Sequence, residues 1–178
     1  MNAIRETPCL LRFVAASQFR RQVLVDFMEI RRLQSDGYVL LASAIQSLIP
    51  RDERDGRVAS DAHLRRALEN PACYFIICLI DSMPVGYLSA YGFPAIDTDC
   101  SQVYLYDIIV AEGHRRKGIG SRMIEELKVH CEADGADHIW LGTSLENEAA
   151  QRAFEGTGAR KVSETYIEYV YSFNGGRT

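Results

Sequence analysis

The stretch YLYDIIVAEGHRRKGIGSRMIEEL, residues 104–127, is the most informative part of this 178-residue chain. Its apolar run up to Val110 predicts a buried strand, and the apolar residues that follow Gly118 recur every three or four positions, which predicts an amphipathic helix. A helix that begins after a basic turn presents unpaired N–H groups and the positive end of its dipole. We therefore expect an anionic group, most simply a pyrophosphate, to bind at this turn.

Glycines and basic residues make up the turn itself. Gly118 and Gly120 carry no Cβ that would keep a phosphate from the backbone, and Arg115, Arg116 and Lys117 add positive charge. Basic residues at a helix N-terminus oppose the dipole, so they are costly unless an anion binds there. The turn lacks both the Gly-Lys-Ser/Thr of a Walker A loop and the GxGxxG of a dinucleotide site. A helix that merely starts with basic residues is the alternative interpretation.

Length and composition predict one α/β domain over residues 1–178, with 47% hydrophobic and 25% charged residues. A net charge of −4 argues against a nucleic-acid partner and suits a cationic small molecule. The five cysteines and four histidines show no metal-ligand spacing, so we expect no metal and reduced thiols. We find no signal peptide or membrane span in the sequence and expect a cytoplasmic protein.

Hydrophobic periodicity and turn residues predict the following elements. Helices are expected from a Ser17 cap to Asp36-Gly37, over 38–49, from Ser60 or Asp61 to Leu68, from Gly118 to Asp134-Gly135 and over 147–156. Strands are expected over 10–15, 74–80, 85–93, 103–110, 138–141 and 162–173, with a turn at 81–84.

Two blocks of sequence resemble a known family. The turn Arg115–Gly120 resembles the Arg/Gln-x-x-Gly-x-Gly/Ala signature of the GNAT acetyltransferase superfamily. The block NEAAQRAFEGTGA, residues 147–159, resembles the family's Asn-x6-Tyr-x3-Gly-Phe/Ala element, with Phe154 in place of the tyrosine. The resemblance covers roughly residues 74–173. It implies a GNAT-type mixed, mostly antiparallel central sheet, flanked by helices and splayed at the acetyl-CoA site.

Within the superfamily, the segments GYLSAYGFPAI and VYLYDIIV look most like aminoglycoside 3-N-acetyltransferases. The position of Asp107 and the NE…GA helix also resemble spermidine/spermine N-acetyltransferases. Both groups acetylate primary amines of polycations.

The resemblance implies acetyl-CoA as the cofactor and assigns residues to it. Main-chain groups of Ile108, Ile109 and Val110 would meet the pantetheine arm. The pyrophosphate would be held by the amides of Arg115, Arg116, Lys117, Gly118, Ile119, Gly120 and Ser121. Asn147 would either hydrogen-bond the pantetheine or cap the next helix. Phe154 would lie near the thioester sulfur, where it could not protonate the leaving thiolate as a tyrosine is proposed to do.

Asp107 is the candidate catalytic base. It interrupts an apolar strand, where an unpaired carboxylate is costly to bury, and it could accept the proton of the acceptor ammonium. The alternative is that it only pairs with a neighbouring tyrosine or a backbone amide. Strand alternation would place it on the opposite face from Tyr104, Tyr106 and Ile108.

These features predict an enzyme that moves an acetyl group from acetyl-CoA to a small polycationic amine, an aminoglycoside at its 3-N position first, and hence antibiotic resistance. A polyamine or peptide acceptor, or an acyl-CoA-binding module with weak catalysis, stays open. Because superfamily members are often dimers, a homodimer is also an expectation.

Overall fold

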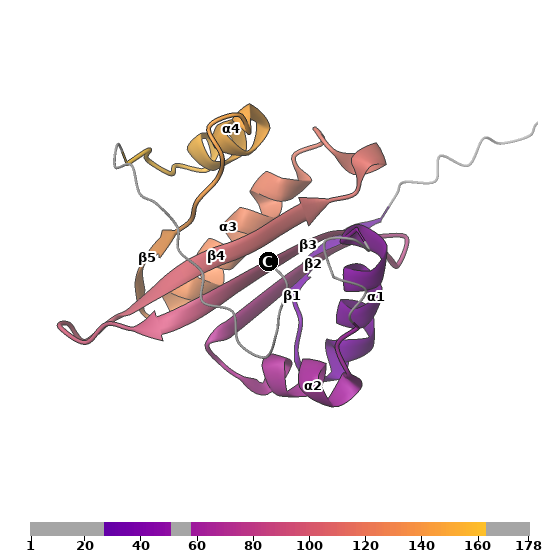
Figure 1. Ribbon diagram of the computed structural model, residues 1–178, viewed down its shortest axis with the longest axis horizontal. Helices are drawn as coiled ribbons and strands as arrows, with labels where there is room; N and C mark the ends of the chain where they lie inside the picture. Colours follow the sequence, from indigo (N-terminus) through magenta and orange to yellow (C-terminus); the bar gives the residue numbers. More distant parts are fainter. Residues whose placement is uncertain (1–26, 51–57, 163–178) are drawn as a thin grey trace, which may run out of the picture.

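The computed structural model describes residues 27–50 and 58–162 (Figure 1). Five of its strands form one sheet in the order β1-β2-β3-β4-β5. They are β1 Met28–Arg32, β2 Cys73–Ile80, β3 Met83–Pro94, β4 Ser101–Val110 and β5 Ala136–Trp140. Neighbouring strands are antiparallel except β4 and β5, which are parallel. The predicted mixed, mostly antiparallel sheet is confirmed.

Helices flank both faces of the sheet (Figure 1). The helices α1 Tyr38–Leu48 and α2 Asp61–Glu69 pack on one face, and α3 Ile119–Ala133 and α4 Glu148–Gly156 contribute to the core on the other. Two short 3-10 turns, η1 Ser35–Gly37 and η2 Glu112–His114, precede α1 and the start of α3. We call these two faces of the sheet the α1/α2 face and the α3 face.

The continuous apolar run in β2 shows why the sheet has helices on both sides. Side chains alternate along a strand, so Tyr74, Ile76 and Cys78 join the core on the α3 face. Phe75 and Ile77 join the core on the α1/α2 face, and both residues are almost fully buried. A strand that is apolar at every position requires cover on both faces.

Local signals place several boundaries where the sequence predicts them. Ser60 is the N-cap of α2, because its Oγ accepts a hydrogen bond from the His63 amide at 3.3 Å. Asp81 and Ser82 both adopt positive φ, 49° and 66°, and form the two-residue turn between β2 and β3. The turn is shorter than the expected 81–84, since β3 already begins at Met83.

The expected helix from Ser17 to Asp36-Gly37 is wrong where the structure describes it. Residues 28–32 form β1, which pairs with β2 from Met28↔Ile80 to Arg32↔Ile76. The apolar residues of this segment fit a helical spacing, but the edge of β2 offers backbone partners and Met28 and Ile30 pack against the α3-face core. Of the other expectations, the strand 10–15, the Ser17 cap and residues 163–173 of the last strand lie outside the described residues.

Candidate functional site

The site is built around an irregularity in β4. Cross-strand pairing runs Ser89↔Asp107 and then Ala90↔Leu105, which leaves Tyr106 without a partner and makes it a β-bulge. The bulge reverses the alternation of side chains. Before it, Leu105 faces the α3 side, and after it Ile108 does so.

The bulge puts Asp107 on the α1/α2 face, together with Tyr104 and Tyr106. Tyr91 lies opposite Tyr104 in the β3–β4 pairing, and its ring centroid is 5.9 Å from that of Tyr106. The rings of Tyr104 and Tyr106 are 6.1 Å apart. The expectation that Asp107 faces away from these two tyrosines is therefore wrong, because regular alternation does not hold across the bulge. Ile108 does lie on the opposite face, as expected.

Asp107 is half-buried and has a polar neighbour on β3. The Tyr87 hydroxyl donates to Asp107 Oδ2 at 3.3 Å and lies 3.3 Å from the Ser89 Oγ. Burial raises the pKa of the Asp107 carboxyl, and the Tyr87 hydrogen bond partly opposes this. A carboxylate with a raised pKa is a better proton acceptor than a solvated one.

Among the described residues, no strand pairs with the edge of β4 beside Asp107. Pairing between β4 and β5 extends from Ser101 to Tyr104, and within the described residues β5 ends opposite this point at Trp140. The Ala111 amide donates to the Val85 carbonyl at 2.8 Å, and alternation along the ladder then directs the main chain of Ile109 toward β3. The main-chain groups of Ile108 and Val110 point toward the side that β5 has left.

The basic turn follows directly. Arg115 Nε donates to the Val110 carbonyl at 2.9 Å, which ties the turn to the end of β4. Arg116 and Gly118 both adopt positive φ, 62° and 77°. α3 then begins at Ile119 with no side chain capping its first amides, so these N–H groups are available to an anion.

Gly120 makes room at the same place. A Cβ built on it would meet only Ile108 Cδ1, at 3.7 Å, which is an ordinary contact. Its backbone does not adopt a positive φ. Neither packing nor conformation within the described residues requires glycine here, which fits a position where a ligand approaches the backbone.

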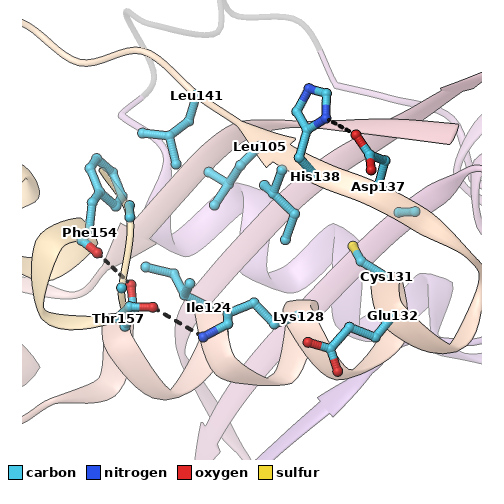
Figure 2. A pocket seen from close by; sticks show the side chains of 14 residues that line it. Leu105, Ile124, Lys128, Cys131, Glu132, Asp137, His138, Leu141, Phe154 and Thr157 are labelled. Carbon is cyan, nitrogen blue, oxygen red and sulfur yellow. Dashed lines mark hydrogen bonds and ion pairs between the residues drawn. The ribbon is translucent and has the colours of Figure 1, made fainter. Parts of the chain in front are cut away.

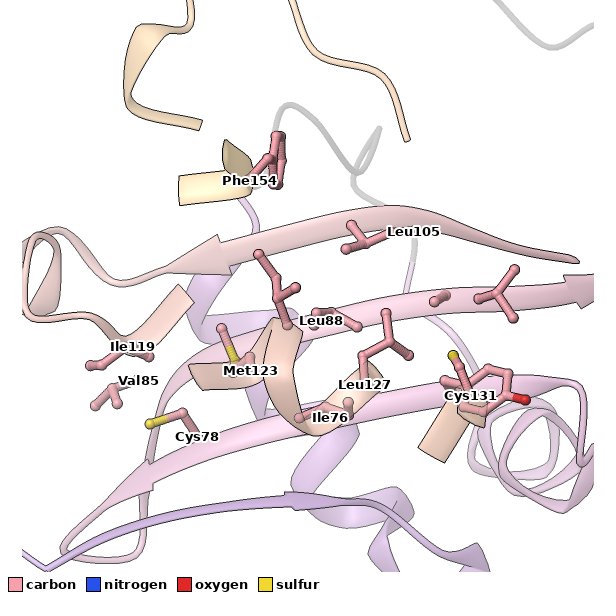
Figure 3. Close-up of a cluster of buried hydrophobic side chains, with 14 residues drawn as sticks. Ile76, Cys78, Val85, Leu88, Leu105, Ile119, Met123, Leu127, Cys131 and Phe154 are labelled. Atoms are coloured by element: carbon pink, nitrogen blue, oxygen red, sulfur yellow. The ribbon is translucent and has the colours of Figure 1, made fainter. Parts of the chain in front are cut away.

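Asn147 and Phe154 lie elsewhere. Asn147 Oδ1 accepts from the Ala150 amide at 3.1 Å, so the structure shows the helix-capping role. Phe154 lines a cavity of about 300 Å³ between α3, β5 and α4 (Figure 2). Thr157 lines the same cavity, and its carbonyl accepts a hydrogen bond from Lys128 Nζ. Phe154 is buried within the α3-face cluster, which also contains Leu105 of β4 (Figure 3). Asp107 and Phe154 therefore belong to opposite faces of the sheet.

Residues 30–159 match the acetyltransferase (GNAT) family. The chain belongs to this family. GNAT enzymes are acetyl-CoA-dependent N-acetyltransferases, so the expected enzyme class and co-substrate are those of the family.

Similar proteins support this membership. The chain is 30% identical over 69 residues to the mouse protein N-acetyltransferase family 8 member 3, an alignment that covers 39% of this chain and 30% of the relative. It thus spans less than a third of that relative's length.

Solved structures show the same GNAT fold. One is an aminoglycoside acetyltransferase from an uncultured soil metagenomic sample, with 27% identity, a TM-score of 0.67, and coverage of 82% of this chain and 99% of that one. Another is the aminoglycoside N-acetyltransferase AAC(6')-Iy in complex with CoA, with 20% identity, a TM-score of 0.65, and coverage of 82% and 95%. The second acts, by its name, at a 6' position, so the comparisons do not establish 3-N specificity in this GNAT chain.

The sequence reasoning missed Tyr87 and Ser89 as functional candidates. Ser89 is buried, with 1% of its surface exposed, and it interrupts an apolar strand as Asp107 does. The available signal was a polar residue within each of two neighbouring predicted strands. The cross-strand register that pairs these two residues could not be read from the sequence. Within residues 27–50 and 58–162, no group of three or more His, Cys, Asp or Glu side chains could hold a metal ion. The same residues contain no helix with the length and apolarity needed to cross a membrane.

Proposed function

We propose that this GNAT-family chain transfers an acetyl group from acetyl-CoA to a primary amine of a small cationic acceptor, with an aminoglycoside as the first candidate. The observation that carries the proposal is the position of Asp107. It is a half-buried carboxylate next to an edge of β4 that no other described strand covers, and β4 leads directly into the basic turn.

The residues around the turn fit coenzyme A. The uncapped amides at the start of α3 and the room at Gly118 and Gly120 suit a pyrophosphate. The exposed side chains of Arg116 and Lys117 add positive charge. The outward main-chain groups of Ile108 and the Val110 amide would hold the pantetheine arm, and the Val110 N–H would polarise the thioester carbonyl oxygen. When bound, acetyl-CoA supplies the acetyl group as a thioester, and the coenzyme A thiolate that leaves would take up the second proton that the acceptor nitrogen loses.

Asp107 would act on the acceptor. An amine is an ammonium at neutral pH and must lose a proton before it can attack a carbonyl carbon. The Asp107 carboxylate takes this proton, directly or through a water, and later releases it to solvent. Holding the amine beside the carbonyl carbon would contribute several kcal/mol more, up to about 10.

The aminoglycoside acceptor rests on supporting evidence of two kinds. Structures of similar fold include enzymes that are named as aminoglycoside acetyltransferases. Asp97 and Asp99, which are exposed in the connection between β3 and β4, add negative charge that could attract a polycation. The position that is acetylated, 3-N or 6', is a separate question for product analysis.

The test is release of free coenzyme A, read with a thiol reagent, from acetyl-CoA and a panel of aminoglycosides, spermidine and lysine-containing peptides. We expect turnover with aminoglycosides and a loss of about 100-fold or more in Asp107→Asn. Turnover with spermidine or peptides alone would contradict the proposal that the acceptor is an aminoglycoside. Full activity of Asp107→Asn would contradict the proposed role of Asp107 as the base. Absence of turnover and of any acetyl-CoA-induced rise in Tm would overturn the proposal as a whole.

A further inference from the structure

Three polar side chains meet on the α1/α2 face where β3 pairs with β4. Ser89 is the cross-strand partner of Asp107, and Tyr87 precedes it by two residues on the same face. The Tyr87 hydroxyl lies 3.3 Å from Asp107 Oδ2 and 3.3 Å from Ser89 Oγ. Tyr87 and Ser89 are almost fully buried, with 6% and 1% of their surfaces exposed.

We propose that Tyr87 is the positioning residue of Asp107: its hydroxyl fixes the carboxylate for the acceptor amine and sets the pH above which the carboxylate can take the proton. This inference rests on the proposed role of Asp107 as the base. It assigns to the reaction a residue that would not contact the acceptor itself.

The direction of the hydrogen bond follows from the chemistry of the three groups. A tyrosine hydroxyl has one proton, and two oxygens lie at equal distance from it. An ionised carboxylate is the stronger acceptor, so the proton goes to Asp107. The Ser89 hydroxyl can then donate to the Tyr87 oxygen, so each of the three side chains has a hydrogen-bond partner.

Tyr87 remains a donor throughout the working pH range. Burial raises the pKa of its hydroxyl well above the usual value, and the negative charge of Asp107 raises it further. Its hydrogen bond in turn lowers the pKa of Asp107, against the larger effect of burial. The hydroxyl thus keeps a half-buried carboxylate ionised at a pH where burial alone would favour the neutral acid.

Tyr87 is the group that lowers the pKa of Asp107, and the other titratable groups on this face are as follows. The hydroxyl of Tyr91 and the thiol of Cys73 on β2 each have a pKa that burial raises, so both are neutral as well. Tyr106 is the exposed bulge residue beside Asp107. Of the helices packed on the face, α1 contributes Tyr38, whose ring lies 3.7 Å from the guanidinium carbon of Arg65 on α2. Burial raises the pKa of Asp107, and the Tyr87 hydrogen bond is the contact that opposes it.

The decisive variant is Tyr87→Phe, which keeps the ring and removes the hydroxyl. We expect the acidic limb of the kcat/KM profile for the acceptor to move to higher pH and kcat to fall by roughly 3- to 10-fold. The rise in Tm caused by acetyl-CoA should be unchanged, since the turn before α3 is untouched. An acidic limb at the wild-type pH would overturn the proposal.

Tyr74→Phe is the matched control. Tyr74 is an equally buried tyrosine on β2, but on the α3 face, where its hydroxyl bonds to Asp134. We expect it to alter stability and leave the pH profile in place. If Tyr74→Phe moved the acidic limb of the kcat/KM profile as far as Tyr87→Phe does, the loss of any buried hydroxyl would have this effect. That result would overturn the proposal.

Asp107→Asn separates this proposal from the one on which it rests. If Asp107→Asn is inactive while Tyr87→Phe keeps the wild-type profile, the base stands and only the positioning role fails. If Asp107→Asn is fully active, the base itself fails.

A second perturbation of opposite sign covers the case in which Tyr87→Phe does not fold. Replacement of Tyr87 by 3,5-difluorotyrosine keeps the hydroxyl and makes it a stronger donor. The acidic limb should then move to lower pH. A limb that stays in place, or moves upward, would overturn the proposal.

Discussion

Arg32 on β1 and Asp134 at the end of α3 form an ion pair across 102 residues of chain, with Arg32 Nη1 3.2 Å from Asp134 Oδ2. The Arg32 side chain is only 15% exposed, and Nη2 also donates to the carbonyls of Pro71 and Cys73. Its guanidinium carbon lies 4.3 Å from the centre of the Tyr74 ring. The Arg32 side chain thus connects β1 to the start of β2 and to the end of α3.

Arg32→Ala should lower the free energy of unfolding by roughly 2 to 3 kcal/mol, because it removes the Arg32 hydrogen bonds to two carbonyls and its ion pair with Asp134. Urea denaturation measures this. Arg152→Ala is the control: Arg152 pairs with Glu148 on α4 at 3.0 Å, but both side chains are more than two-thirds exposed. Its loss should cost about 0.5 kcal/mol or less. Equal costs for the two variants would contradict the role of Arg32.

β1 and β2 show how far the sequence predicts the fold. The run Cys73–Ile80 is apolar at every position, so a strand covered on both faces was predictable. Residues 28–32 were not, because five residues with two apolar side chains fit a strand or a helix equally well. The backbone partners on β2 decide the matter, and they are 44 residues away in the sequence at the closest pair, Arg32↔Ile76. Short edge strands are fixed by tertiary pairing and not by local pattern.

The same distinction applies to the site. The basic glycine turn could be predicted because its chemistry lies in consecutive residues, Arg115 to Gly120. The face of Asp107 could not, because no residue type marks Tyr106 as a bulge. The bulge appears only when Ser89 and Ala90 are aligned with β4. Phe154 matches a motif position, yet its packing in the α3-face core depends on where α4 lies.

Gly120→Ala should separate cofactor binding from stability. The new Cβ would contact only Ile108 Cδ1 at 3.7 Å, and alanine favours a helix over glycine by up to about 1 kcal/mol. We expect an unchanged or higher Tm and a KM for acetyl-CoA raised by about tenfold, since the methyl group would occupy space meant for the pyrophosphate.

Gly156→Ala provides the comparison for Gly120. Gly156 is helical, at the end of α4, and a Cβ there meets nothing within 4 Å among the described residues. It should gain similar stability with no change in the KM for acetyl-CoA. If Gly120→Ala also leaves the KM unchanged, the pyrophosphate does not bind against Gly120.

Asp107→Asn should stabilise the fold at neutral pH. Burial raises the folded-state pKa of Asp107, so the folded protein holds this proton more tightly than the unfolded chain. The resulting stability is fully present below the unfolded pKa and is lost as the pH rises through the folded one. The asparagine variant avoids this loss, and its Tyr87 hydrogen bond can remain.

Urea denaturation at several pH values tests this sign. The variant should match the wild type below the usual range of an aspartate pKa and exceed it in stability above the raised pKa. The exposed Asp99→Asn should show no such dependence. A wild type that is more stable than Asp107→Asn at neutral pH would mean that the ionised carboxylate has compensating partners.

Phe154 should matter for packing and not for proton transfer. Its ring is 8% exposed, belongs to the α3-face cluster and lines the cavity of about 300 Å³. Phe154→Ala should lower the free energy of unfolding by about 3 kcal/mol or more. Phe154→Leu keeps most of the volume and should cost about 1 kcal/mol. Because the phenyl ring carries no exchangeable proton, Phe154→Leu should keep kcat within about threefold of the wild type. A large fall in kcat with wild-type stability and an unchanged KM for acetyl-CoA would place the ring at the reacting atoms instead.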